Sequence, residues 1–210
     1  MPSEEHIIDI DLTTLPWEEA YKFAIGSVVP RPIAWVSTTN SSGIHNIAPF
    51  SFFNVFCAAP LMLGFAPMTP DDRERKDTLA NILQQRDFVV NIATEPTLER
   101  MDRTGRQWPP EVDEFVIAGL TPLPGVKVRA PRIAESPISF ECALHQFVPL
   151  GEGEGGATLV LGRAVYLHVD EGVLRNGRVD PVLLQPVARM GGPFYARPEI
   201  LPYRRADREE

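Results

Sequence analysis

Two short stretches of the chain combine residue types that can hold a flat, phosphorylated ligand. The first runs from Pro49 to Asn54 and places three phenylalanines beside small polar residues, starting at a proline that cannot donate to a strand ladder. Aromatic rings suit the faces of a planar heterocycle, and Ser51, Asn54 and free backbone N–H groups can hydrogen-bond its edges. The alternative interpretation is that Phe50 and its neighbours are ordinary sheet core.

The second stretch is Lys76-Asp77-Thr78, which stands directly before apolar residues at helical spacing. This pattern predicts a helix start with Asp77 or Thr78 as N-cap. A helix start offers unpaired N–H groups and positive dipole charge, so the Lys76 ammonium and the Thr78 hydroxyl make it fit for a phosphate. Asp77 would repel a phosphate and must therefore point away or accept hydrogen bonds from ligand hydroxyls. The alternative is a solvated lysine beside plain capping residues.

Cations elsewhere are also candidates, because a chain of net charge −8 must meet an anionic ligand with a local positive patch. Arg31 is one such cation, for which a strand-edge ion pair is the alternative. Arg189 precedes Gly191-Gly192, where backbone can approach a ligand closely. As a cation, Arg189 could bind a second phosphate or a substrate. A surface ion pair is an equally good interpretation of this residue.

The elements that must position these residues are mostly strands. Apolar and β-branched patterns predict strands over residues 33–38, 44–48, 61–66, 88–92, 138–148, 157–169 and 187–192. Short helices are predicted over residues 17–24, 77–83, 95–102 and 113–118, with a further turn at Asp180-Pro181. Gly26 is expected to end the first helix, which packs on the sheet or on a second subunit. One domain spanning residues 1–210 is therefore predicted.

The loop from Gly151 to Gly156 contains G-x-G-x-x-G, the spacing of a dinucleotide-binding turn. That motif needs a helix after the glycines, whereas here a strand follows, and two glutamates would repel a pyrophosphate. We therefore interpret the loop as the tip of a hairpin.

Several classes of function lack support in the sequence. The four histidines do not cluster, and Cys57 and Cys142 lie far apart in the sequence, so no metal site is predicted. Both cysteines are expected to be buried thiols. The negative charge argues against nucleic acid and anionic membrane as partners, and no apolar run approaches the ~20 residues of a membrane span. Residues 1–11 carry no basic signal region, which favours the cytoplasm. No nucleophile motif appears, as expected where a cofactor carries the reaction.

The order and spacing of several motifs resemble the flavin reductase-like family, which includes flavoredoxin. The resemblance rests on Pro30-Arg31-Pro32-Ile33-Ala34-Trp35-Val36-Ser37-Thr38, Asn46-Ile47-Ala48-Pro49-Phe50-Ser51-Phe52-Phe53-Asn54, Lys76-Asp77-Thr78, Glu114-Phe115, Ala118-Gly119-Leu120-Thr121, Glu135-Ser136-Pro137, Glu141-Cys142 and Arg189-Met190-Gly191-Gly192 with Tyr195. It covers nearly the whole chain. It implies a mostly β, FMN-binding split barrel with short helices, in which two subunits of a homodimer complete each flavin pocket.

The resemblance also implies a function, an NAD(P)H-dependent flavin reductase in which hydride passes to N5 of FMN. Electrons would then leave to free flavin or to a redox partner protein. The alternative is a flavoredoxin-like electron carrier without NAD(P)H activity of its own, and a third reading of the motifs is a barrel that has lost its flavin.

Particular residues take roles under the same resemblance. Phosphate would be held by Lys76, Thr78 and Arg31, and polar ring edges by Ser51 and Asn54. The segment from Ala48 through Pro49 to Phe50 would supply backbone contacts and a wall, with Thr38 as a weaker candidate. Trp108 is interpreted as a dimer contact rather than a lid, and Trp35 as either core or cofactor contact.

Overall fold

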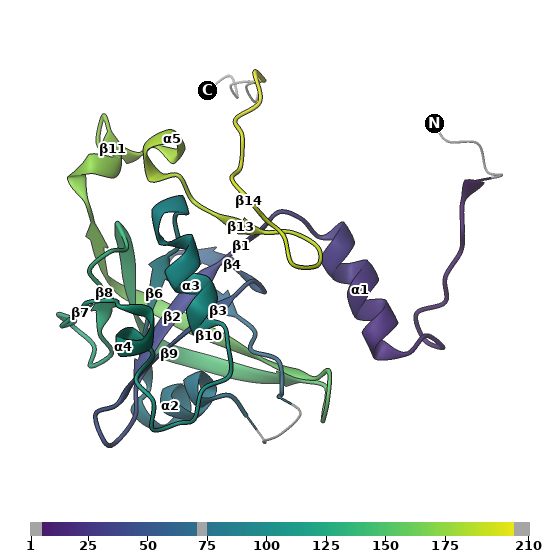
Figure 1. Cartoon of the computed structure of the whole chain (residues 1–210), viewed down its shortest axis with the longest axis horizontal. Coiled ribbons are helices and arrows are strands. Elements are labelled where there is room, and N and C mark those ends of the chain that lie inside the picture. The colour runs from purple at the N-terminus through teal and green to yellow at the C-terminus, as the bar shows by residue number, and fades with distance from the viewer. Residues whose placement is uncertain (1–5, 71–74, 204–210) are drawn as a thin grey trace.

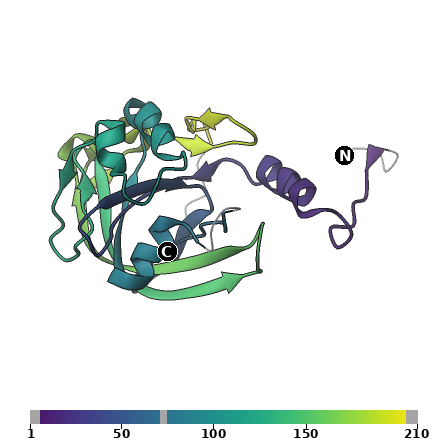
Figure 2. The same ribbon diagram turned by 60° about the horizontal axis from the view of Figure 1, so that its bottom comes forward.

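The computed structural model describes residues 6–70 and 75–203, and its centre is a seven-stranded antiparallel sheet (Figure 1). The strand order is β3-β2-β6-β9-β10-β5-β4. The strands are β2 (Ala34–Thr39), β3 (His45–Phe50), β4 (Phe53–Ala58), β5 (Leu61–Phe65), β6 (Asp87–Ile92), β9 (Ile138–Leu150) and β10 (Ala157–Val169). Figure 2 shows that the sheet curls strongly, with the long β9–β10 hairpin along one side.

Short helices and small ribbons surround this sheet. The helices are α1 (Trp17–Ser27), α2 (Asp77–Gln85), η2 (Glu95–Thr97), α3 (Leu98–Thr104), α4 (Glu114–Ala118), η3 (Glu171–Val173) and α5 (Pro181–Leu184). The ribbons are β1 (Arg31–Pro32) with β13 (Ala188–Arg189) and β14 (Tyr195–Ala196), β7 (Pro122–Leu123) with β8 (Arg132–Ile133), and β11 (Leu174–Arg175) with β12 (Arg178–Val179). Within the described ranges, no helix has the length and apolar character needed to cross a membrane.

The curled sheet separates two hydrophobic cores, because successive side chains of a strand point to opposite faces. Ala34 and Val36 of β2 face the inner core, where Phe65 and Phe88 meet at a ring distance of 5.5 Å. Trp35 faces the outer core against α3 and α4, is fully buried, and donates from Nε1 to Thr104 at 3.0 Å. Of the two sequence-based interpretations of Trp35, the structure places it in the core.

Helix α1 buries none of its residues and projects away from the barrel (Figures 1 and 2). It continues past Gly26, so the expected end at that glycine is wrong. The Arg31 guanidinium donates to the carbonyls of Ile25 and Val28 at 2.7 Å each, and to Met190 at 3.0 Å. A buried cation therefore satisfies carbonyls that a glycine cap would otherwise serve.

Most predicted strands are confirmed, but three local expectations are wrong. Strand β4 was not predicted, and it leaves Cys57 exposed rather than buried. The strand expected over residues 187–192 shrinks to β13, because the chain turns at Met190, whose N–H donates to Phe194 at 2.9 Å. Helix α2 begins at Asp77 with Lys76 in the N-cap position and no side-chain cap, so neither Asp77 nor Thr78 caps it.

Candidate functional site

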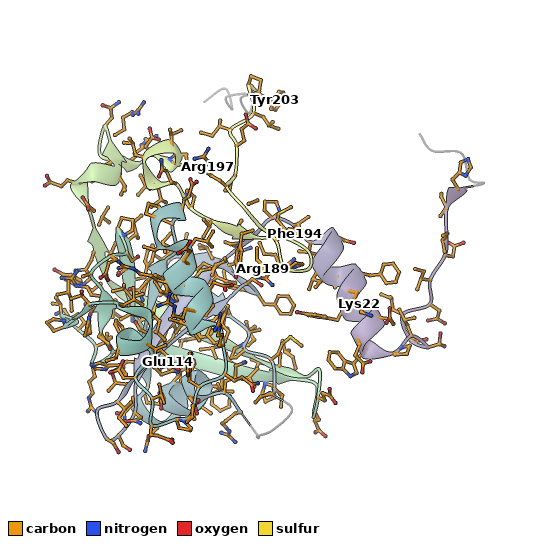
Figure 3. The ribbon with its side chains drawn as sticks, in the orientation of Figure 1. Lys22, Glu114, Arg189, Phe194, Arg197 and Tyr203 are labelled. Atoms are coloured by element: carbon orange, nitrogen blue, oxygen red, sulfur yellow. The ribbon has the colours of Figure 1, made fainter. Side chains whose placement is uncertain are left out.

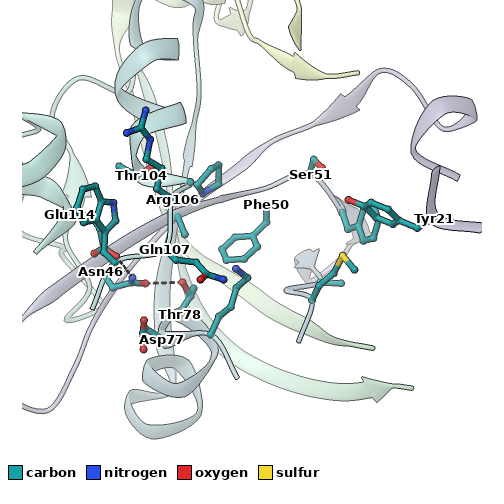
Figure 4. Close-up of a pocket in the computed structure, with 18 residues that line it drawn as sticks. Tyr21, Asn46, Phe50, Ser51, Asp77, Thr78, Thr104, Arg106, Gln107 and Glu114 are labelled. Carbon is teal, nitrogen blue, oxygen red and sulfur yellow. Dashed lines mark hydrogen bonds between the residues drawn. The ribbon is translucent and has the colours of Figure 1, made fainter. Parts of the chain in front are cut away.

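A cavity of about 190 Å³ opens where the end of β3, the start of α2 and the segment after α3 meet (Figure 4). Seven of the eleven residues singled out in the sequence line it. They come from two segments, Ala48, Pro49, Phe50 and Ser51, and Lys76, Asp77 and Thr78. The fold thus unites the aromatic segment and the helix start that the sequence keeps apart.

The wall of this cavity follows from the alternation of β3. Residues 46, 48 and 50 share one face of the strand, and all three line the cavity. Phe50 is buried and packs against Phe65 with ring centroids 5.0 Å apart, so the inner core fixes its ring. After Phe50 the chain bends, and this bend carries Ser51 along the cavity rim. The cavity therefore has a rigid apolar wall with a small hydroxyl at its edge.

The polar end of the cavity is organised by Asn46. Its side-chain oxygen accepts from the Thr78 hydroxyl at 2.7 Å, and its Nδ2 donates to Glu114 at 2.8 Å (Figure 4). Thr38 lies behind, donating to the same Asn46 oxygen at 3.3 Å and accepting from Asn81 at 3.0 Å. Thr38 does not line the cavity, so its effect on a ligand acts through the position of Asn46.

Glu114 brings a titratable group to the cavity although it is only 5% exposed. Burial raises the pKa of Glu114 to about 7, and the nearby Asp77 carboxylate adds to the rise. Hydrogen bonds to its own backbone, to Asn46 and to the N–H of Ile47 oppose that rise. Glu114 therefore changes charge near neutral pH, directly beside the helix start.

A second cavity of about 370 Å³ adjoins the first and shares Pro49, Ser51 and Arg106 with it. We call it the arginine cavity, because Arg31 and Arg189 line it together with Arg106. Two of the sequence candidates, Arg31 and Arg189, therefore lie outside the first cavity but next to it.

Asn54, like Thr38, lines neither cavity. It lies exposed on β4, where its side-chain oxygen accepts from the N–H of Val55 at 2.8 Å. The bend after Phe50 redirects the chain, so the continuous segment from Pro49 to Asn54 contributes its first four residues, Pro49 to Phe52, to the cavity.

Sequence reasoning gave no role to several residues that line the first cavity. Asn46 and Glu114 stood inside the quoted motifs, and the alternation 46, 48, 50 was the available signal for Asn46. Trp108 lines the cavity, with Nε1 donating to the Arg103 carbonyl at 3.4 Å, and its expected dimer contact stays a prediction. Tyr21 of the projecting helix α1 reaches the cavity too, and no sequence pattern indicated that.

The curled antiparallel sheet, with a cavity beside its edge strand β3, has the architecture of a split barrel. The family model described as "Flavin reductase like domain" matches residues 25–188. The chain belongs to this flavin reductase-like family. An uncharacterized protein of Aquifex aeolicus is 44% identical over 178 residues, which cover 84% of this chain and 89% of the relative.

Solved structures agree with this assignment. Nitrilotriacetate monooxygenase component B from Bacillus cereus is 32% identical with a TM-score of 0.88, covering 93% of this chain and 97% of that one. The 2-nitrobenzoate 2-nitroreductase NbaA of Pseudomonas fluorescens is also 32% identical, with a TM-score of 0.84 and coverage of 95% and 97%. A putative flavin reductase with a split barrel domain from Shewanella frigidimarina, 22% identical at a TM-score of 0.80 with 98% of both chains covered, shares the fold. The predicted mostly β split barrel and the family resemblance are confirmed.

Proposed function

We propose that this protein binds FMN in the first cavity and uses it to oxidise NAD(P)H, passing the electrons to free flavin or to a redox partner protein. The observation that carries the proposal is the meeting of two features in one cavity. A phenylalanine wall suits a flat ring, and a helix start with Lys76 suits a phosphate. Membership of the flavin reductase-like family and neighbours named as a monooxygenase component and a nitroreductase support an oxidoreductase.

The chemistry of the cavity fits FMN at both of its ends. Lys76 and the backbone N–H groups at the start of α2 would hold the phosphate. The Thr78 hydroxyl donates to Asn46, which fixes its orientation. The backbone N–H of Thr78 would donate to the phosphate, and the hydroxyl oxygen can still accept a hydrogen bond. Backbone groups of Ala48 to Phe50 and the Ser51 hydroxyl would meet the ring edge. Bound FMN supplies hydride acceptance at N5, which explains why the sequence displays no nucleophile of its own.

Arg31 has a smaller role in this proposal than the resemblance implied. Four of its five N–H groups donate within the chain, to three carbonyls and, at 3.4 Å, to the Ser51 hydroxyl. We therefore assign the phosphate to Lys76 and α2, and assign to Arg31 the positioning of Ser51 and α1.

One chain encloses only part of a flavin. The first cavity has a volume of about 190 Å³, which lies below the ~300–1,000 Å³ typical of ligand pockets. A homodimer partner would therefore cover the open side of the cavity. Exposed apolar side chains near that side support this arrangement, namely Phe52, Val55 and Phe56. We place the protein in the cytoplasm, where NAD(P)H is available.

The deciding experiment records the visible spectrum of purified protein and then NADH and NADPH consumption with added FMN. A flavin spectrum together with turnover supports the proposal. A tightly bound flavin without nicotinamide turnover identifies an electron carrier instead. Colourless protein that fails to quench FMN fluorescence contradicts both functions.

A further inference from the structure

The arginine cavity concentrates positive charge in a chain whose net charge is −8. Arg31, Arg106 and Arg189 line it, against a single carboxylate from Asp102. That carboxylate already accepts from the Tyr195 hydroxyl at 2.8 Å. The ion pairs found among the described residues include none of the three arginines. The cavity therefore carries cationic charge that protein carboxylates do not balance.

Two of the three arginines, Arg31 and Arg189, are held in place by contacts within the chain, whereas Arg106 is exposed. Arg31 is 6% exposed and bound by carbonyls of two separate segments. Arg189 donates to the Gly192 carbonyl at 2.9 Å, and its guanidinium lies 4.7 Å from the ring centre of Tyr195. Figure 3 shows Arg189 beside the end of α1 nearest the barrel. Burial lowers the pKa of Arg31 and the charge of Arg189 lowers it further, as expected for cations that face one another.

The remaining lining of the arginine cavity combines apolar side chains with the hydroxyl-bearing side chains of Tyr21, Ser51 and Tyr195. Ile33 and Met101 are buried there, and Pro49 forms the wall shared with the first cavity. A ligand suited to these surroundings has an anionic head and a small apolar body. A planar guanidinium matches a carboxylate with two parallel hydrogen bonds, which favours a carboxylic acid.

We propose that the arginine cavity binds the carboxylate of a small organic acid, which is thereby held beside the flavin. The proposal rests on the proposed function, since it takes the first cavity as the flavin site. Arg106 lines both cavities and so ties the acid to the flavin edge. A flavin phosphate is not the expected occupant, because Lys76 and the start of α2, to which we assign it, line the first cavity and not this one.

The test titrates FMN-loaded protein with benzoate and, separately, with the uncharged isostere benzamide, following the flavin absorption spectrum. We expect benzoate to bind and benzamide to bind at least about tenfold more weakly, as the loss of a charge-assisted pair implies. Arg189→Gln and Arg106→Gln should each weaken benzoate by a similar factor. Arg178→Gln, an exposed arginine on β12, is the matched control and should leave benzoate affinity unchanged.

Four results would overturn the proposal. Equal binding of benzoate and benzamide, or unchanged benzoate affinity in both cavity variants, removes the carboxylate site. A loss of FMN affinity in Arg189→Gln, with Arg189→Lys restoring it, assigns the cavity to the flavin phosphate. Inorganic phosphate displacing benzoate at equal concentration assigns it to a phosphorylated ligand.

Separate measurements distinguish failure of the proposed FMN function from failure of the carboxylate site. Protein that does not quench FMN fluorescence ends the proposed function, but calorimetric titration of that same protein with benzoate still decides the anion site. Heat of binding that Arg189→Gln abolishes then supports the site alone, and absence of heat rejects it. Circular dichroism of each variant, compared with Arg189→Lys, shows that the fold is kept.

Discussion

Lys76 stands in the N-cap position of α2 and lines the first cavity, so its charge and the helix dipole act on the same ligand atom. We predict that Lys76→Ala together with Thr78→Ala weakens FMN affinity at least about tenfold, or roughly 1.4 kcal/mol. Fluorescence quenching of FMN measures the change. Lys127→Ala removes an equal charge at an exposed position and should leave the affinity as it is. Unchanged affinity in the double variant would withdraw the phosphate assignment.

Burial of Glu114 makes the folding stability depend on pH, because burial raises the pKa of its carboxyl group. Its pKa rises from 4.5 to about 7 on folding, so the folded state binds this proton in a window where the unfolded state releases it. Stability is therefore lost as pH rises through that window. We predict that the free energy of unfolding of Glu114→Gln, measured relative to the unchanged protein by urea denaturation, rises by about 2 kcal/mol from pH 5 to pH 8. A difference between the two proteins that stays constant with pH would contradict this assignment.

The same residue links pH to ligand binding. A charged Glu114 lies beside the helix start that would hold a phosphate, so FMN should bind more tightly at pH 6 than at pH 8. Because Glu114→Gln removes the titration, the pH dependence of its FMN quenching should flatten over this range. Asp77 shares this cavity and is present in both proteins, so it cannot produce the difference between them.

Among the elements, α1 is joined to the barrel by the Arg31 guanidinium in addition to the ring contact of Tyr21 with Phe52. It buries no residue, and Arg31 joins its last carbonyls to Met190 beyond β13. We predict that Arg31→Lys, which keeps the charge but has too few donors in the right geometry, increases amide hydrogen exchange throughout α1. Exchange in β9 and β10 should not change, which is the internal control. Exchange in α1 equal to that of the original protein would show that other contacts hold the helix.

The helices and strands also show how much of the fold and of the candidate site can be predicted from the sequence. Strand alternation and helix spacing located β2, β3, β5, β6, β9, β10, α2 and α4, and with them the aromatic wall and the helix start of the cavity. The bend at Ser51 has no turn signature, so β4 and the outward position of Asn54 were missed. Glu114 gains its role from contact with Asn46, sixty-eight positions away in the chain, which no local pattern encodes.

At the scale of the whole molecule, apolar side chains remain exposed on β4, which follows the cavity-lining Phe52, and on α1, whose Tyr21 lines the cavity. Val55 and Phe56 of β4 are 56% and 55% exposed, Phe23 of α1 is 50% exposed, and α1 itself extends away from the barrel. Clustered apolar surface of this kind marks an interaction site, whereas a single exposed side chain needs no explanation. A second copy of the chain would bury β4 and cover the flavin at once.

We therefore predict a dimer of two 23.4 kDa chains in light scattering, and a monomer for Val55→Asp, because a carboxylate cannot be buried unpaired at an apolar interface. Val116→Asp is the matched control, since Val116 on α4 is 77% exposed and lies away from β4. If the partner completes the flavin site, Val55→Asp also weakens FMN affinity although neither cavity is lined by Val55. A monomeric variant with full FMN affinity would show that one chain suffices for the flavin, and a variant that stays dimeric would place the interface elsewhere.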